Sequence, residues 1–259
     1  EIGRGGMGVV LRIWADALRR TLAMKVVLAK GERSRDAAPE VDPRTLGRFL
    51  EEAQITGQLE HPGIVPVHEL GLDSGGRVFF TMRLVQGQDL RRIFAAVREG
   101  RDGWTRERAL GVLQRVCETM AFAHERGVIH RDLKPANVMV GRFGETYVMD
   151  WGLARVVGRR DSHDLRLKPR SEDASALSLV RTVRKDESTQ NPDSPLVTMD
   201  GDVIGTPSYM APEQARGKLE EVGPRSDVYS LGAMLYYMLT GEAPYVKNGE
   251  RLSPHTVLS

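Results

Sequence analysis

Cysteine is nearly absent from this sequence. Its single example, Cys117, excludes a disulfide within the chain and is typical of a reducing compartment, so we expect a cytoplasmic location. Long apolar runs are missing as well. The longest, AMLYYML at 233–239, is far too short to cross a bilayer, and no signal peptide is visible. The expected cytoplasmic location applies to residues 1–259 and does not exclude a membrane anchor elsewhere in a longer protein.

An excess of charge of either sign is also missing. Lys and Arg number 37 and Asp and Glu number 35, which gives a formal net charge of +2. The balance gives no indication of a nucleic-acid or membrane-surface partner. The histidines are scattered without metal-ligand spacing. With 41% hydrophobic and 28% charged residues, the composition is that of an ordinary globular protein.

Glycine, by contrast, forms a pattern at the start of the chain, EIGRGGMGVV. Gly3, Gly5 and Gly8 spell G-x-G-x-x-G, which occurs in dinucleotide-binding turns, in glycine flaps over nucleotide phosphates, and in plain turns. A dinucleotide turn needs a helix directly after the glycines and an acidic residue about 20 positions on. Two runs rich in β-branched and apolar residues follow instead, VVLRIW and RRTLAMKVVL, and the second presents Lys25. The pattern therefore favours strands and the flap.

Helix and strand signals continue along the chain. Asp42 and Pro43 predict the start of a helix over 43–59, and strands over 64–70 and 77–85 flank the turn DSGG. From Gln88 the pattern is helical. The alternating spacing of three and four predicts one buried stripe, with the cysteine as a core thiol, formed by Leu110, Leu113, Cys117, Met120 and His124.

The last third of the sequence contains one strongly apolar helix. Ser226 is predicted to cap it, Gly241 to end it, and its apolar residues to place it in the middle of a domain. Short strands are predicted at NVMV and TYVMD. Residues 158–200 are polar and poor in aromatics, which predicts a mobile loop.

The chemistry is carried by HRDLKPAN at 130–137 and by DWG at 150–152. Together with G-x-G-x-x-G-x-V up to Val10, AMK at 23–25, a helix glutamate and GTPSYMAPEQ at 205–214, these segments cover nearly the whole chain. In this order and spacing the sequence resembles a eukaryotic-type (Hanks-type) serine/threonine protein kinase, and it is most similar to bacterial members of that family. Trp151 departs from the usual Phe, and we interpret it as a bulkier packing residue.

The resemblance implies an α+β, bilobal fold. A small antiparallel-sheet lobe with one long helix is expected over 1–85, and a mainly helical lobe over 86–259, with a long activation segment at 150–213. The final helices of the second lobe and the arginine partner of Glu213 have no counterpart in the sequence. We therefore expect a kinase domain truncated at both ends and of marginal stability.

The resemblance also implies ATP and Mg²⁺ as cofactors. Lys25 would hold phosphate and be held in turn by a helix carboxylate; periodicity does not separate Glu51 from Glu52, and alignment with the family favours Glu52. Asp132 would accept the proton of the attacking hydroxyl and Lys134 would stabilise the transferred phosphate. The oxygen ligands implied for Mg²⁺ are Asn137 and Asp150.

The remaining contacts to the nucleotide follow from the same resemblance. The adenine ring is expected between Val10, Ala23 and Met139, beside the backbone of a hinge from Arg83 to Val85, with Met82 guarding the pocket behind. His130 is expected to pack rather than to catalyse, and Asp227 to fix the backbone of the catalytic loop.

The expected activity is transfer of the γ-phosphoryl group of ATP to Ser or Thr hydroxyls of protein substrates, with autophosphorylation, for which a homodimer is one expectation. Phosphorylation of Thr198, bridging Arg131 and Arg155, is expected to activate the enzyme, and Thr206 to lie on the substrate side. One alternative is a pseudokinase or nucleotide-binding scaffold, which is disfavoured because no catalytic position is lost. A small-molecule kinase is the other, and it would be expected to lack GTPSYMAPE.

Overall fold

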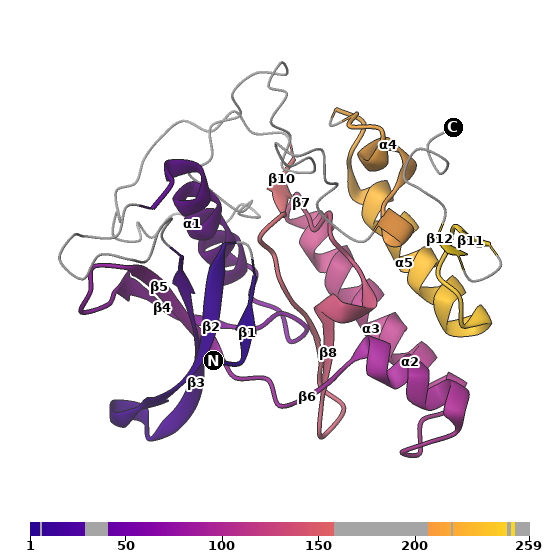
Figure 1. The fold of residues 1–259 in the computed structure, drawn as a ribbon, viewed down its shortest axis with the longest axis horizontal. Coiled ribbons are helices and arrows are strands. Elements are labelled where there is room, and N and C mark those ends of the chain that lie inside the picture. The colour runs from indigo at the N-terminus through magenta and orange to yellow at the C-terminus, as the bar shows by residue number, and fades with distance from the viewer. Residues whose placement is uncertain (6, 29–40, 158–206, 219, 248–249, 252–259) are drawn as a thin grey trace.

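A computed structural model describes residues 1–5, 7–28, 41–157, 207–218, 220–247 and 250–251 (Figure 1). The first part of the chain forms a sheet with one long helix beside it, and the part that follows is mainly helical. Among the described residues, no helix is both long and apolar enough to span a membrane.

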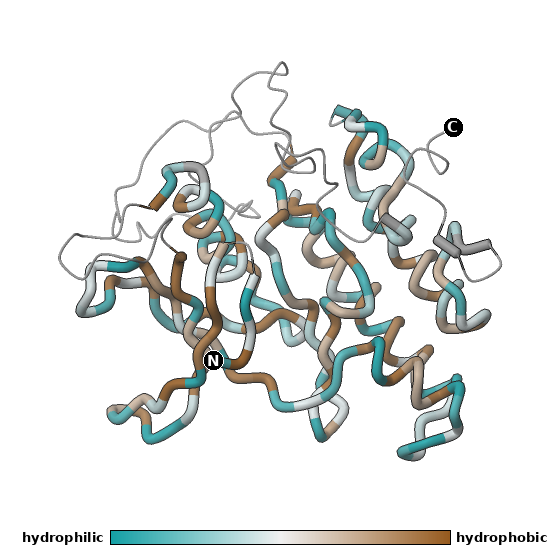
Figure 2. The backbone as a smooth tube through the Cα atoms, in the orientation of Figure 1, coloured by the Kyte–Doolittle hydropathy of each residue, from teal (hydrophilic) through white to brown (hydrophobic). Residues whose placement is uncertain are grey.

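The first part is built on a five-stranded antiparallel sheet in the order β1-β2-β3-β5-β4. Its strands are β1 (Gly3–Arg4), β2 (Gly8–Ala15), β3 (Arg20–Val27), β4 (Val67–Leu72) and β5 (Val78–Arg83), with a 3-10 turn η1 (Asp16–Leu18) between β2 and β3. Hydrophobic residues follow one another along the central strands in Figure 2. The glycine stretch therefore leads into strands, as predicted, and not into a helix.

Helix α1 (Pro43–Gln58) packs on this sheet. Its start is confirmed, because the Asp42 side chain accepts a hydrogen bond from the Thr45 backbone N–H at 2.9 Å and Pro43 occupies the first turn. Phe49 and Ala53 of α1 form a small core with Val27 and Phe80 of the sheet. This packing fixes the position of α1 beside β3.

The second part begins at β6 and contains the larger core. Its elements are β6 (Gly87–Asp89), α2 (Leu90–Glu99), α3 (Arg106–Glu125), β7 (Val128–Ile129), η2 (Pro135–Asn137), β8 (Val138–Gly141), β9 (Thr146–Val148), β10 (Arg155–Val156), η3 (Pro207–Tyr209), α4 (Pro212–Ala215), α5 (Pro224–Thr240), β11 (Val246–Lys247) and β12 (Glu250–Arg251). Strands β6, β8 and β9 form a three-stranded antiparallel sheet, and β7 pairs with β10.

The prediction for the buried face of α3 was wrong in part. Leu113 and Met120 are buried, but Cys117 is exposed and Leu110 is 44% exposed. The buried row is centred on Val116 instead, because α5, β7 and β9 all pack against that side of α3. Spacings of three and four fit two neighbouring rows equally well, and only the packing partners decide between them.

Two predictions for α5 also need correction. The helix starts at Pro224 with Gly223 as its N-cap, so Ser226 lies inside the first turn, where its hydroxyl accepts a hydrogen bond from the Gly223 N–H. The helix is not covered on all sides by the described residues, since Val228, Tyr236 and Leu239 are at least half exposed. Its end at Gly241 is as predicted: this glycine is left-handed, with φ 78°, and its N–H bonds to the Tyr237 carbonyl.

Candidate active site

Strand β3 and helix α1 bring one lysine and one glutamate together. The Lys25 Nζ atom lies 2.6 Å from both carboxylate oxygens of Glu52, and both side chains are largely buried. The Asp150 Oδ1 atom lies 3.9 Å from the same Nζ. The contact is to Glu52; Glu51 is buried too, but in a different position on the helix. This pair places a cation beside Asp150.

Burial and charge pull the pKa values of this group in opposite directions. Burial raises the pKa of Glu52, and the attraction of Lys25 only partly opposes it. For Lys25, burial opposes the charged form, but the carboxylates of Glu52 and Asp150 outweigh burial and raise its pKa. The lysine is therefore held as a cation, ready for an anionic ligand.

The loop after β7 and the turn η2 that follows it present three polar side chains to one another. The Asp132 Oδ2 atom accepts hydrogen bonds from Lys134 Nζ at 2.7 Å and from Asn137 Nδ2 at 3.0 Å. The same Asn137 Nδ2 also donates to the Asp132 backbone carbonyl at 2.9 Å. The three residues thus form one connected group, in which the asparagine makes two of the three hydrogen bonds.

Hydrogen bonds to a side chain of α5 hold the backbone of this loop in place. The Asp227 carboxylate is 1% exposed and accepts hydrogen bonds from the backbone N–H groups of His130 at 2.8 Å and Arg131 at 2.9 Å. It also contacts His124 Nε2 at 2.8 Å, and the Gln214 side chain donates to the Arg131 carbonyl at 2.9 Å. The bonds from His124 and Gln214 have no signal in the sequence patterns used above.

His130 is engaged on both ring nitrogens. Its Nδ1 atom accepts from the Asp132 N–H at 3.2 Å and its Nε2 atom faces the Met149 carbonyl at 3.0 Å, which corresponds to the neutral tautomer with the proton on Nε2. The ring is fully buried and packs against Trp151 with 4.7 Å between ring centres. These contacts leave it the packing role expected from the sequence.

The segment carrying Asp150 is joined to the same loop. The Met149 N–H donates to the Asn137 carbonyl at 2.8 Å, and Asp150 itself has a left-handed backbone with φ 60°. Trp151 is 2% exposed and its indole N–H donates to the Val148 carbonyl at 3.2 Å. The larger residue therefore packs in the core and adds a hydrogen bond that Phe could not make.

Close approach of other atoms requires glycine at one position around this group and favours it at another. A Cβ at Gly8 would lie 2.7 Å from the Val26 carbonyl oxygen, so β2 could not pair closely with β3. A Cβ at Gly152 would collide with the Met7 side chain and lie 3.1 Å from Glu52 Oε2. At Gly5, a Cβ would meet no described atom within 4 Å, so no contact with the described residues requires glycine there.

The other expected nucleotide contacts lie on five strands and on the segment that follows β5. Val10 on β2 pairs with Lys25, and Ala23 on β3 pairs with Met82 on β5. Arg83 ends β5, Val85 follows it, and Met139 lies on β8 directly opposite Tyr147 on β9. Gly3 lies in β1, paired with Val10. Ala23 lies on the same strand as Lys25, and Val10, Met82 and Arg83 lie on the two strands that pair with it.

Several expectations fall outside the described residues. Thr198, Thr206 and the whole segment predicted to be a mobile loop belong to 158–206, so the activating phosphorylation stays a prediction. Arg131 and Arg155, its expected partners, are described; Arg131 Nε donates to the Leu153 carbonyl and Arg155 lies in β10. Glu213, in α4, accepts a hydrogen bond from the Ser226 hydroxyl.

Comparisons with known proteins give a consistent result. A family model described as protein kinase domain matches residues 1–175 and 179–257. The chain is 36% identical over 265 residues to the serine/threonine-protein kinase PknD of Chlamydia trachomatis serovar D, which covers 99% of this chain and 26% of that relative. It is 33% identical over 253 residues to PknD of Protochlamydia amoebophila, which covers 95% and 23%. The chain thus spans about a quarter of the length of the curated relatives that it matches.

Proposed function

The chain belongs to the protein kinase family, and we propose that it is an ATP-dependent serine/threonine kinase that phosphorylates protein substrates. One observation carries the proposal: Lys25 on β3 lies 2.6 Å from Glu52 on α1 and 3.9 Å from Asp150, which follows β9 in the second part of the molecule. A structural ion pair does not require a third carboxylate beside it. A site that binds a polyphosphate together with a metal cation does require a further carboxylate, because the lysine neutralises the phosphates and the carboxylate neutralises the cation.

The nucleotide is proposed to bind under the glycine stretch. Gly3, Gly5 and Gly8 let backbone N–H groups approach phosphate oxygens, and Lys25 supplies a cation to the phosphates. Among the described residues no atom lies within 4 Å of a Cβ at Gly5, which supports this role, since the glycine there serves no described packing contact. The adenine ring is proposed to lie between Val10, Ala23 and Met139, with Met82 behind it, and to bond to the backbone between Arg83 and Val85.

Asn137 and Asp150 fit the requirements of a divalent cation. Each carries a hard oxygen donor, and the Asn137 amide nitrogen is turned to Asp132, which leaves its oxygen for a cation. The Asp150 side chain is about half exposed, so it is open to a ligand. Mg²⁺ is the proposed ion; bound there, it would neutralise charge on the phosphate oxygens.

Asp132 is proposed to accept the proton of the Ser or Thr hydroxyl. Its Oδ2 atom already accepts two hydrogen bonds, so Oδ1 is the oxygen that takes the proton. Lys134, 2.7 Å from Oδ2, is close enough to stabilise the phosphoryl group as it leaves ATP. Because Asn137 bonds to Asp132 and is a proposed metal ligand, it couples the base to the cation.

The organisation of the chain follows from the same proposal. We place the sheet-containing lobe at 1–85 and the helical lobe at 86–259, with an activation segment over 150–213. The proposed partners are protein substrates with Ser or Thr acceptors and a second copy of the chain for autophosphorylation, in the cytoplasm. The pseudokinase alternative has no support from the site, because every residue that would act in catalysis is present in the sequence.

The test is transfer of the terminal phosphate of labelled ATP, with Mg²⁺, to a general acceptor protein such as casein. We expect label on Ser and Thr in acid hydrolysates, none on Tyr, and loss of transfer on chelation of divalent cations. Asp150→Asn is the matched variant and should lose transfer while it retains the fold. Label on Tyr alone, or undiminished transfer by Asp150→Asn, would contradict the proposal.

A further inference from the structure

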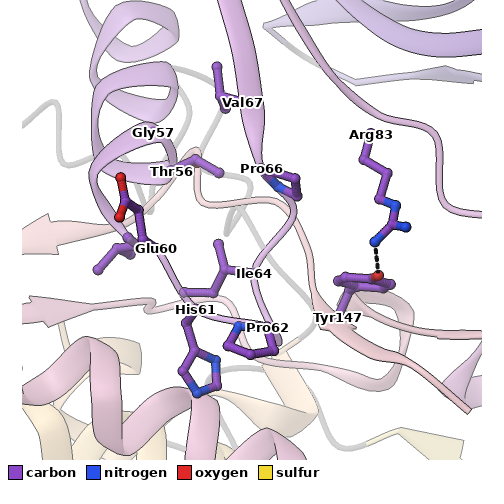
Figure 3. A pocket seen from close by; sticks show the side chains of 11 residues that line it. Thr56, Gly57, Glu60, His61, Pro62, Ile64, Pro66, Val67, Arg83 and Tyr147 are labelled. Atoms are coloured by element: carbon purple, nitrogen blue, oxygen red, sulfur yellow. Dashed lines mark hydrogen bonds between the residues drawn. The ribbon is translucent and has the colours of Figure 1, made fainter. Parts of the chain in front are cut away.

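A cavity of about 530 Å³ lies beside the end of β5, and none of Lys25, Asp132 or Asp150 lines it (Figure 3). Its walls come from the end of α1, the connection to β4, the start of β4, the end of β5 and β9. The floor is largely apolar, with Leu59 and Ile64 both buried. Two polar residues at one side of it, Arg83 and Tyr147, face each other.

These two residues form a hydrogen bond between the two parts of the molecule. The Arg83 Nη1 atom donates to the Tyr147 hydroxyl at 2.8 Å, as the dashed line in Figure 3 shows. The arginine is exposed at the edge of the cavity, whereas the tyrosine is only 5% exposed. A surface arginine is therefore held by a phenol whose ring is fixed in place.

The backbone at each end of this bond is well anchored. Arg83 pairs with Leu22 of β3, and its N–H donates to the Pro66 carbonyl at 3.3 Å. Tyr147 lies in the middle of β9, and the next residue, Val148, donates to the Gly63 carbonyl at 2.8 Å. The side-chain bond thus joins the end of one anchored strand to the middle of another.

The two residues are adjacent to the proposed adenine site. Directly opposite residues of an antiparallel pair project from the same face, so Tyr147 stands beside Met139, the proposed floor under adenine. Arg83 starts the hinge segment whose backbone is proposed to bond the ring. Asp150 follows Tyr147 by three residues. The hydrogen bond between Arg83 and Tyr147 therefore links the hinge segment to the strand pair that carries Met139, on which the adenine ring would lie.

We propose that Arg83 and Tyr147 are positioning residues that set the affinity for nucleotide by holding the hinge at a fixed height above Met139. The inference rests on the proposed function. Neither side chain contacts the reacting atoms in this arrangement; each acts through the hinge backbone or through Met139. Breaking the bond should weaken ATP binding about three- to tenfold, the value of one ordinary hydrogen bond, and leave kcat within about twofold.

A purely structural role predicts a different result. An exposed arginine bonded to a neutral hydroxyl adds little to the stability of the fold, because water replaces it readily. Loss of such a bond would change the unfolding temperature slightly and would change nucleotide affinity not at all. Measurements of nucleotide affinity therefore distinguish the two roles, whereas measurements of stability do not.

The variants are Tyr147→Phe, which removes only the hydroxyl, Arg83→Met, which removes the donor, and the two combined. Arg83→Lys tests for rescue, because lysine retains a cationic donor. Arg108→Met is the matched control: Arg108 also lies on an aromatic ring, 4.3 Å from the centre of Trp104, but at the start of α3. The probe is Mg-ATP, with Kd from titration calorimetry and KM and kcat from phosphate transfer.

We expect both single variants to raise Kd and KM about three- to tenfold, the double variant to be no worse than either, and Arg83→Lys to fall between. The control should match the parent. Parental Kd in the single variants, multiplied effects in the double variant, or a fall in kcat with unchanged Kd would each overturn the inference while the proposed function stands. A parent chain that binds no Mg-ATP would overturn both.

Discussion

Two buried polar clusters in this molecule are built on opposite principles. Lys25 and Glu52 join β3 to α1 through two long charged side chains, beside the half-exposed Asp150. Asp227, 1% exposed, instead holds two backbone N–H groups of the loop that carries Asp132. The first contact can break when α1 moves, whereas the second can break only if the loop unfolds. The difference suggests that an ion pair serves the chemistry and backbone bonds serve the architecture.

Energetics support this division. Replacing a buried ion pair by apolar residues of similar size is often neutral for stability or favourable, because both charges lose their hydration when buried. Buried backbone donors have no such substitute, since they remain in place whatever side chain faces them. The first cluster should therefore be dispensable for folding and the second should not. The predictions that follow break each cluster in turn.

The largest effect on stability is expected from Asp227→Ala. It leaves the N–H groups of His130 and Arg131 buried without an acceptor, and each costs about 1–3 kcal/mol, so the free energy of unfolding should fall by about 2–6 kcal/mol. Denaturant titration measures it. Asp42→Ala is the matched control, because it removes an aspartate that accepts one backbone N–H at a helix start and should cost about 1 kcal/mol. Equal losses in the two variants would contradict the account.

Lys25→Met should lower turnover about 10²–10³-fold, because a fixed cation beside the phosphates is lost. It should also destabilise the chain, since Glu52 stays buried without its partner. The decisive variant is Lys25→Met combined with Glu52→Leu, for which we expect the stability of the parent and the inactivity of the single variant. A double variant as unstable as Lys25→Met would show that the ion pair is needed for folding after all.

His124→Ala provides a finer test of the Asp227 cluster. The histidine contacts the Asp227 carboxylate at 2.8 Å, but the two backbone donors remain when it is removed. The expected loss is about 0.5–1.5 kcal/mol, well below that of Asp227→Ala. Unfolding curves of the two variants, recorded together, measure the difference. If His124→Ala cost as much as Asp227→Ala, the side chain and not the backbone would be the main partner of the carboxylate.

The smallest effect is expected in the pH dependence of stability. Burial raises the pKa of Glu52 in the folded chain above its usual value of 4.5. A carboxyl group with a raised pKa in the folded state favours folding below its unfolded pKa, and this contribution is lost as the pH rises through the folded pKa. The stability of the nucleotide-free parent relative to Glu52→Gln should therefore decrease as the pH rises from 4.5. A relative stability that increased over this range would reverse the sign and contradict the assignment.

The sequence predicted where helices begin and end better than it predicted which of their residues are buried. Asp42 and Gly241 were identified correctly because a cap and a left-handed glycine depend on adjacent residues alone. Cys117 was misplaced because its burial depends on which side of α3 packs against α5, β7 and β9, and the periodicity of α3 does not contain that information. Periodicity also could not separate Glu51 from Glu52, since the position of β3 decides which of them meets Lys25.

The candidate site shows the same limit. The motif residues were identified through the resemblance to a protein kinase, because the motifs of that family occur in order along this sequence. The contact between Arg83 and Tyr147 joins residues 64 positions apart, and the residues next to them in the sequence form no motif that indicates it. The same holds for His124 and Asp227, which are 103 positions apart. Such contacts follow from the arrangement of whole elements.

The central claim is that the polar group around Asp132 performs phosphoryl transfer while a separate group binds the nucleotide. Asp132→Asn tests it most directly, because it removes the base and retains an oxygen for Lys134 and Asn137. The measurement is Kd for Mg-ATP alongside turnover on one protein substrate. The account predicts a Kd within about twofold of the parent and turnover lower by about 10²–10⁴-fold. Turnover equal to that of the parent would contradict it.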